Sequence, residues 1–486
     1  MRISHLFILL AASAMLTACD FLDEYNPNSV TVGNYYTSEE DIVASLNGVY
    51  TSLTQSYVAD NYHYFTDVRA NATVVTNSGA NSGIPYQFYN YTLTEENVYV
   101  YNRYSQLYKI ISRANTLFAH LGDVSYAAPS ARDTYEAEAR FLRALAYYWL
   151  VTEWGDVPLV LKALESAEEV RANNYRRPKA EVYQAIFDDL KYVTESPLAD
   201  VQPASACGKV SKSAAWALWG KALLQQACDE DFVGSKSELL GQAIEKLTAA
   251  WNLRKFGELA SVPYSAIWDL STQKSCAENI FQINYIQGNA DLGSVWNYLY
   301  GPEGTGVTSQ KKGEMQNVTT QAVYDSFETG DVRRSFLRAT NMAGQTYYHT
   351  MKYADLECGA NGYGGNNWIV LRYADVALML AEAYYWSEEE TLAKTWLNKV
   401  RERAGLGDWS GSDLRQGIYD ERLHEFMQEG LRWQDLLRMY DRTEMLEHFS
   451  AINSNFSLKD LLLPIPYNER ILNPEGLYQN PGYGDN

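Results

Sequence analysis

Hydrophobic side chains recur along most of this chain at the spacing of an amphipathic helix. An α-helix has 3.6 residues per turn, so positions three or four apart share one face. Between residues 104 and 121, for example, Leu107, Ile110 and Ala114 fall on one face. The same pattern predicts helices over residues 41–53, 104–121, 135–151, 181–193, 211–227, 242–253, 373–386, 392–404 and 418–438. The chain is therefore predicted to be mainly α-helical.

Successive predicted helices with small residues at their contact points favour helical hairpins stacked side by side, as in tetratricopeptide-like proteins. Their repeat consensus of roughly 34 residues is not cleanly present. Residues 256–371, called the insert below, differ, because Gly, Asn and Tyr are frequent and a short β-like run occupies residues 280–285. Residues 451–486 are punctuated by proline and are expected to be extended. We expect residues 19–255 and 372–486 to form a helical frame around a loop-rich insert with short β segments.

The first residues carry an export signal. Arg2 precedes an apolar run at residues 6–16, which is much shorter than the ~20 residues that span a bilayer. The sequence Leu-Thr-Ala-Cys at residues 16–19 then resembles the processing box of bacterial lipoproteins. Cleavage after residue 18 would leave a lipidated Cys19, and more than one acyl chain gives a stable anchor. The alternative is an unmodified cysteine behind an ordinary signal peptide.

Charge and composition narrow the classes of function. Lys and Arg number 40 and Asp and Glu 60, so the formal net charge is −20 and a nucleic-acid partner is not expected. The 38 Tyr residues greatly outnumber the 15 Phe and 12 Trp. A tyrosine offers an apolar ring and a polar hydroxyl, which suits either wet binding surfaces or ordinary helix packing.

No motif of a hydrolase, nucleotide-binding protein or metalloenzyme is present, so we expect no catalytic residue, cofactor or metal. The acidic run at residues 229–231 could attract Ca²⁺, although such loops are more often only solvated. Cys207, Cys228, Cys276 and Cys358 lack the spacing of a zinc site and are expected as isolated thiols, although the sequence leaves their pairing open. Glutamates at positions 421, 425 and 429, with arginines at 422, 432 and 438, favour an ion-pair ladder over an acid–base pair.

Several blocks of the sequence resemble the SusD/RagB family of outer-membrane lipoproteins. They follow the family's order and lie at residues 19–27, 40–50, 108–115, 138–159, 371–383, 421–436 and 463–483. The most distinctive block reads Glu-Ala-Arg-Phe-Leu-Arg-Ala-Leu-Ala-Tyr-Tyr at residues 138–148 and Gly-Asp-Val-Pro-Leu at 155–159. The resemblance implies an α-α superhelix with four tetratricopeptide-like helix pairs and a variable region.

The resemblance also implies a non-catalytic, lipid-anchored protein that faces the cell exterior at the outer membrane. Such a protein would bind a glycan and deliver it to a TonB-dependent transporter of the SusC type. Two alternatives remain open, namely the same scaffold binding peptides or glycopeptides, and a tetratricopeptide-like module that assembles proteins.

Candidate ligand contacts follow from the same resemblance, because ligand-contacting aromatics in the family's glycan binders come from loops. One such loop, before the second signature helix, contains Tyr89 and Tyr91, and the insert contains Trp296 and Tyr298. If both segments are extended, each pair of rings shares one face, and we expect the four rings to be exposed together. Arg69 is a further candidate. The alternatives are that either cluster packs as ordinary core and that Arg69 forms a surface salt bridge.

We predict that replacing Cys19 by Ser releases the full-length protein from the membrane in soluble form, because no lipid can then be attached. Fractionation of cells that express the wild-type and C19S chains measures this. A variant that stays membrane-bound and surface-exposed would show that the anchor lies elsewhere.

Overall fold

The computed structural model describes residues 35–56, 58–76 and 83–484. The signal sequence at residues 1–18 and Cys19 therefore lie outside the described residues. None of the helices in the described part of the chain combines the length and the apolar character that a membrane crossing needs.

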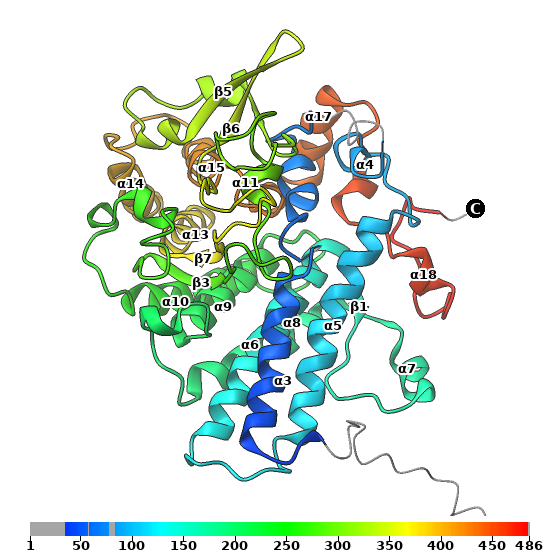
Figure 1. Cartoon of the computed structure of the whole chain (residues 1–486). Coiled ribbons are helices and arrows are strands. Elements are labelled where there is room, and N and C mark those ends of the chain that lie inside the picture. The colour runs from blue at the N-terminus through cyan, green and yellow to red at the C-terminus, as the bar shows by residue number, and fades with distance from the viewer. Residues whose placement is uncertain (1–34, 57, 77–82, 485–486) are drawn as a thin grey trace, which may run out of the picture.

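A continuous array of helices forms the frame (Figure 1). The long helices are α3 (Glu39–Thr51), α5 (Val98–His120), α6 (Ala131–Trp154), α8 (Lys179–Glu195), α9 (Lys212–Ala227), α10 (Lys236–Asn252), α13 (Tyr373–Trp386) and α14 (Glu390–Arg403). Each packs against the next long helix along the chain, from α3 on α5 through to α13 on α14. The predicted fold class, mainly α with short β segments, is confirmed.

Local signals explain where these helices begin and end. The Asn97 side chain accepts hydrogen bonds from the backbone N–H groups of Tyr99 and Val100, so α5 begins at Val98, earlier than the apolar spacing predicts. Gly155, with φ 75°, ends α6.

The single helix predicted over residues 418–438 is wrong. The chain instead forms α15 (Leu414–Glu425) and α16 (Arg432–Met439), separated by a tight turn. Gln428 and Gly430 adopt positive φ angles of 64° and 77°, which interrupt a right-handed helix. A Cβ atom on Gly430 would lie 2.9 Å from the Tyr62 ring, so this turn also packs closely against the first part of the chain.

The insert contains most of the β structure. Its antiparallel sheet has the order β4-β6-β5, formed by Thr319–Thr320, Gln345–Thr350 and Leu337–Met342. The predicted β-like run becomes β3 (Asn279–Ile283), which pairs antiparallel with β7 (Trp368–Arg372). A further two-stranded ladder joins β1 (Val157–Pro158) to β2 (Arg176–Arg177). The short helices α11 (Trp296–Leu299) and α12 (Gln321–Asp325) complete the insert.

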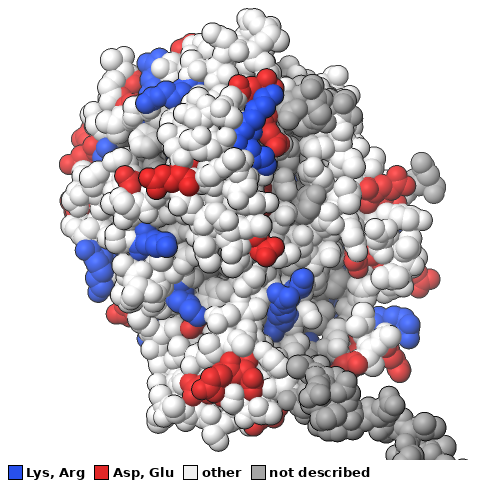
Figure 2. Space-filling model, in the orientation of Figure 1, with Lys and Arg blue, Asp and Glu red and all other residues white. Residues whose placement is uncertain are grey.

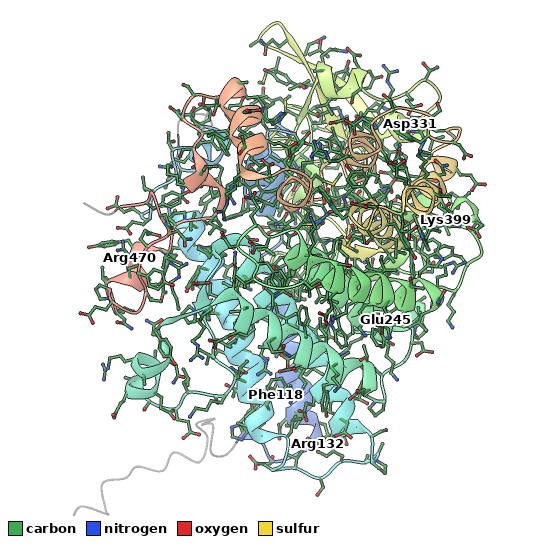
Figure 3. The ribbon with its side chains drawn as sticks, turned by 180° about the vertical axis from the view of Figure 1, so that it is seen from behind. Phe118, Arg132, Glu245, Asp331, Lys399 and Arg470 are labelled. Carbon is green, nitrogen blue, oxygen red and sulfur yellow. The ribbon has the colours of Figure 1, made fainter. Side chains whose placement is uncertain are left out.

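The remaining short helices lie at the edges of the frame. They are α4 (Tyr86–Tyr89), α7 (Ala167–Asn173), α17 (Arg442–Ile452) and α18 (Tyr467–Arg470). Because α17 reaches Ile452 and α18 follows, the expectation that residues 451–486 are wholly extended is wrong. This segment is held against α6, since the Asn480 side chain donates to the carbonyl oxygens of Trp154 and Leu463. Seen from behind, Arg470 at the end of α18 lies at the opposite edge from Asp331 and Lys399 (Figure 3).

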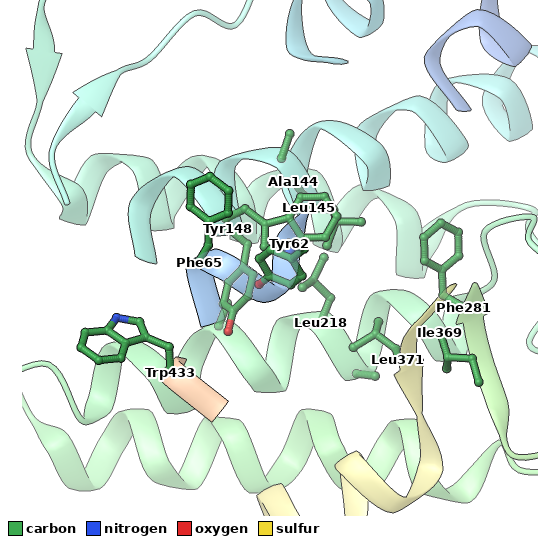
Figure 4. Packing of buried hydrophobic residues seen from close by; sticks show 14 of the residues in the cluster. Tyr62, Phe65, Ala144, Leu145, Tyr148, Leu218, Phe281, Ile369, Leu371 and Trp433 are labelled. Carbon is green, nitrogen blue, oxygen red and sulfur yellow. The ribbon is translucent and has the colours of Figure 1, made fainter. Parts of the chain in front are cut away.

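One large hydrophobic core joins the frame and the insert. Figure 4 shows Tyr62 and Phe65 beside Leu145 and Tyr148 of α6, with Leu218 of α9 and Leu371 of β7 in the same cluster. All of these side chains are at least nine-tenths buried. The core therefore contains residues from the first described helices through to β7, the last strand of the insert.

Buried ion pairs also connect the frame to the insert. Glu425, the last residue of α15, is hydrogen-bonded by Arg333 of the insert, Arg372 of β7 and Arg403 of α14. The ladder predicted within the α15–α16 region is therefore wrong in its partners: Glu421 pairs with Arg333, and Glu429 pairs with Arg372 and Lys352. Isolated buried charges are costly, so these groups are stable inside the protein only as a network.

We predict that Gly220→Ala lowers the free energy of unfolding by about 1–3 kcal/mol, because α9 and α10 approach closely at this glycine. A Cβ atom there would lie 2.5 Å from Leu247 Cγ. The matched control is Gly241→Ala on the exposed side of α10, where no atom lies within 4 Å of the new Cβ. It should stabilise the protein by about 0.5–1 kcal/mol through helix propensity. Urea unfolding measures both, and equal effects would contradict the close approach.

Candidate functional site

The segment that contains Tyr89 and Tyr91 is not extended. Residues 86–89 form the short helix α4, and Tyr91 follows with a positive φ of 52°. The Tyr91 ring is buried edge-on against Phe456 at 5.0 Å, and its hydroxyl donates to the Arg69 carbonyl oxygen at 2.8 Å. Tyr89 stays half-exposed beside Tyr86, with ring centroids 5.7 Å apart. The two rings therefore do not share an exposed face.

Arg69 does not reach the surface. Its guanidinium lies 4.2 Å from the centroid of the Trp433 ring and donates to the Asp460 carbonyl oxygen. The side chain is 1% exposed, and burial lowers the pKa of Arg69. Both the expected ligand contact and the alternative surface salt bridge require an exposed group, so Arg69 instead supports the packing of α16.

The two aromatics of the insert are also buried. Trp296 is enclosed by Tyr285 and Trp368, at centroid distances of 4.8 and 4.9 Å. Tyr298 is 8% exposed, and Lys311 Nζ lies 3.4 Å from its ring centroid. The expectation of four exposed rings on one face is wrong, because residues 296–299 form a helix and not a strand. On a helix, side chains two positions apart point in different directions.

The loop before α5 and the insert nevertheless meet, as the sequence predicts. A line of buried rings connects them through Tyr64, which contacts Phe88 of α4 at 6.1 Å and His63 at 4.0 Å. His63 in turn contacts Tyr300 at 5.1 Å, and Tyr300 contacts Tyr353 at 5.8 Å. The Tyr64 hydroxyl also donates to Gln316 Oε1 at 2.7 Å. The backbone at Val74 pairs with that at Val318, which fixes the same junction.

Partly exposed polar and aromatic side chains border this junction. We call this set the aromatic seam; it comprises Asp60, Tyr86, Tyr89, Tyr99, Glu314, Gln316, Tyr347 and Tyr363. Burial, with smaller contributions from Tyr86 and Tyr347, raises the pKa of Tyr89, so the β6 residue Tyr347 lies close to α4. Tyr363 similarly lies near Tyr298, and the Tyr363 carbonyl oxygen accepts a hydrogen bond from the Gly288 backbone at 2.8 Å.

The polar groups of the seam, Asp60, Glu314 and Gln316, were not predicted from the sequence, and Asp60 is the one among them with a buried oxygen that lacks a hydrogen-bond partner in the described part of the chain. Its Oδ1 atom is buried and has no hydrogen-bond partner within the described ranges, although the residue is partly accessible. Burial raises the pKa of Asp60 to about 7. The carboxylate lies near Tyr298 and Tyr300, because it contributes to the raised pKa of each. A buried acceptor without a donor is unfavourable until a ligand hydroxyl supplies one.

The acidic run at residues 229–231 is not arranged as a cation site. Lys179 Nζ lies 2.6 Å from Asp229 and 3.1 Å from Asp231, and Arg442 lies 2.6 Å from Asp231. Over the described ranges, no group of three or more His, Cys, Asp or Glu side chains is placed to hold a metal ion. The four described cysteines, Cys207, Cys228, Cys276 and Cys358, are free thiols.

Comparison with known proteins supports the resemblance seen in the sequence. A family model described as "Starch-binding associating with outer membrane" matches residues 20–224, and a second, described as "SusD family", matches residues 337–483. SusD-like protein P2 of Formosa agariphila is 28% identical, over 99% of both chains.

Solved structures with the same fold include surface glycan-binding protein A from Bacteroides uniformis. It is 22% identical, with a TM-score of 0.76 over 91% of this chain and 99% of that one. Surface glycan-binding protein A from Bacteroides thetaiotaomicron, in complex with laminarihexaose, is 20% identical with a TM-score of 0.76, over 91% of this chain and 99% of that one.

The helical frame and the two family models together assign the chain to a class of surface binding proteins associated with the outer membrane. The chain belongs to the SusD/RagB family. SusD family proteins are non-catalytic binding proteins, in agreement with the lack of a catalytic motif in the sequence.

We predict that Asp60→Asn stabilises the protein more at pH 8 than at pH 5. The pKa of Asp60 is about 7 in the folded protein against an ordinary value of 3.8. The Asp60 carboxyl therefore stays protonated in the folded state at pH values where it is ionised in the unfolded state. Because the unfolded state then binds fewer protons, stability falls as the pH rises from about 4 to 7. Thermal unfolding of both proteins at the two pH values measures the difference.

Asn cannot ionise, so the gain in Tm should grow with pH. Asp291→Asn, which removes an exposed carboxylate of the insert, is the control and should change Tm by a similar small amount at both pH values. A gain for Asp60→Asn that does not depend on pH would contradict the buried, donor-free position of Asp60.

Proposed function

We propose that this protein binds glycans at the aromatic seam and takes no part in their hydrolysis. The observation that carries the proposal is the position of Asp60, a partly accessible residue with an unsatisfied carboxylate oxygen, which lies near Tyr298 as does the partly exposed Tyr363. Sugar rings present apolar C–H faces that pack on aromatic rings, and their hydroxyls donate to carboxylates and amides. The seam offers both kinds of partner.

The relatives support a glycan as the ligand. One family model carries the description of starch binding, and a structure with the same fold holds laminarihexaose. Charged side chains are scattered over the face that includes α4 and α11, and much of the surface between them is uncharged (Figure 2). This surface suits a neutral polysaccharide better than a strongly anionic one.

A lipid on Cys19 would hold the protein at the outer membrane, facing the cell exterior. The bound glycan would then pass to a SusC-like TonB-dependent transporter. The family relationship supports this arrangement, since the first family model is described as associating with the outer membrane. The stretch of chain between Cys19 and Glu39, where α3 begins, would link the anchor to the frame.

We predict that Tyr89→Ala and Tyr363→Ala each weaken glycan binding by about five- to tenfold, because a stacked aromatic ring contributes about 1–1.4 kcal/mol. Calorimetric titration with laminarihexaose and maltohexaose measures the affinities. Both residues are only partly buried, so Tm should change little. Asp60→Asn should also weaken binding, because the amide is a poorer acceptor than the carboxylate.

Tyr175→Ala is the matched control, since Tyr175 is 40% exposed and lies beside β2, outside the seam. It should leave the affinity unchanged. Binding of peptides but of neither hexasaccharide would contradict the glycan proposal. Unaltered hexasaccharide binding in both seam variants would place the site elsewhere.

A further inference from the structure

A concave surface lies on the side of the frame, away from the seam. The cleft has a volume of about 290 Å³ and lies between α5, the segment at residues 158–174 that contains α7, and α18. We call it the side cleft. Its walls include Tyr108 and Ile111 of α5, Val170 of α7, and Glu469 and Leu472 at α18. In Figure 1, α7 and α18 project from the same edge of the molecule, beyond α5.

The walls of the side cleft are held in place by the rest of the fold. The Asn473 side chain donates to the Asn174 carbonyl oxygen at 2.6 Å, and the Arg176 backbone donates to Gly476 at 2.9 Å. These bonds tie the α7 segment to the α18 segment. The Tyr108 hydroxyl donates to the Pro158 carbonyl oxygen at 2.7 Å, which ties the α7 segment to α5. Hydrogen bonds therefore fix the shape of the cleft.

Large aliphatic side chains are exposed in the wall of the cleft and next to it along the chain. Leu472 and Val170 of the wall are 64% and 48% exposed, and Ile471, which precedes Leu472, is 53% exposed. Leu161, on the same segment as α7, is 47% exposed. Single exposed aliphatic residues are common, but several around one concave surface are typical of a protein contact. A saccharide would be a poor cover for them, because its hydroxyls would lose water without gaining partners.

One carboxylate inside the cleft lacks a cation. Glu469 forms no ion pair among the described residues, and burial raises its pKa. Its charge contributes to the raised pKa of Tyr104 and Tyr108, so it lies near both tyrosines. The Tyr104 hydroxyl is buried beside that of Tyr108. The cleft thus offers a negative charge beside two aromatic rings, a setting that favours a cation.

The basic residues nearby do not fill this role. Lys162, which also borders the cleft, pairs with Glu169 at 3.0 Å, and Arg470 pairs with Glu95. Exposed Glu165, Glu168 and Glu475 outnumber the exposed Arg171 of α7, so the surroundings are acidic on balance. Figure 2 shows more acidic than basic side chains along the edge where α7 and α18 lie. The net negative charge of this surface therefore favours a positively charged ligand.

We propose that the side cleft docks a segment of a partner protein that presents a lysine or arginine between apolar side chains. The basic group pairs with Glu469, its methylene stem packs on Tyr104 and Tyr108, and the flanking apolar residues cover Val170 and Leu472. This surface is separate from the aromatic seam, so the inference does not depend on glycan binding.

The test uses two fluorescent synthetic peptides that differ in one side chain. The first has a central arginine flanked by leucines, and the second has citrulline, which is uncharged and nearly the same shape, in its place. Fluorescence anisotropy with the full mature chain should show the arginine peptide binding about tenfold more tightly. In Glu469→Gln that difference should disappear. Glu447→Gln, which removes an exposed carboxylate of α17, is the matched control and should keep it.

A second variant separates the apolar contribution. Leu472→Ser should weaken both peptides by a similar factor, while its Tm stays close to that of the wild type because Leu472 is mostly exposed. Equal binding of the two peptides to the wild type would overturn the proposal. So would competition by argininamide that matches the arginine peptide in strength, which would indicate a site for small cations. Self-association that Leu472→Ser abolishes, without any peptide binding, would instead assign the cleft to contacts between copies of this chain.

Discussion

The buried carboxylate of Glu425 is the point on which the frame and the insert both depend. Burial alone would raise the pKa of Glu425. The charges of Arg403, Arg372 and Arg333 nevertheless hold this pKa well below its usual range. The three arginines come from α14, β7 and the insert, so their charges are balanced only when all three parts are assembled. Removing one partner from such a network leaves a buried charge uncompensated, at a cost of about 3–5 kcal/mol. The insert is therefore part of the folding unit and not an appended module.

Much of the frame could be predicted from the sequence, because a helix face is a local pattern of neighbouring residues. The break between α15 and α16 could not, because apolar residues such as Phe426 and Met427 continue through it. Its cause is the positive φ angles at Gln428 and Gly430, and at Gly430 the chain also packs closely against Tyr62. The partners in the ion pairs could not be predicted either, because Arg333 and Glu421 are 88 residues apart in the sequence and meet only in the folded chain.

The sequence indicated which segments meet at the candidate site, but not which of their side chains are exposed there. The loop before α5 and the insert do converge, through Tyr64 and Gln316. Tyr91 and Trp296 turn inward, because short helical turns replace the extended segments that the alternating aromatics suggested. A large ring gains more from burial than from remaining at the surface. Asp60 belongs to no motif, and only the folded structure shows that its oxygen lacks a donor.

The line of buried rings from Phe88 through Tyr64 and His63 to Tyr300 has a consequence for binding kinetics. Rings packed in this way leave α4 and the insert little freedom to rearrange, so the seam is already in one arrangement before a ligand arrives. A preorganised surface loses little conformational entropy on binding. Differences in affinity among related ligands should then appear mainly in how long each stays bound, and much less in how fast it associates.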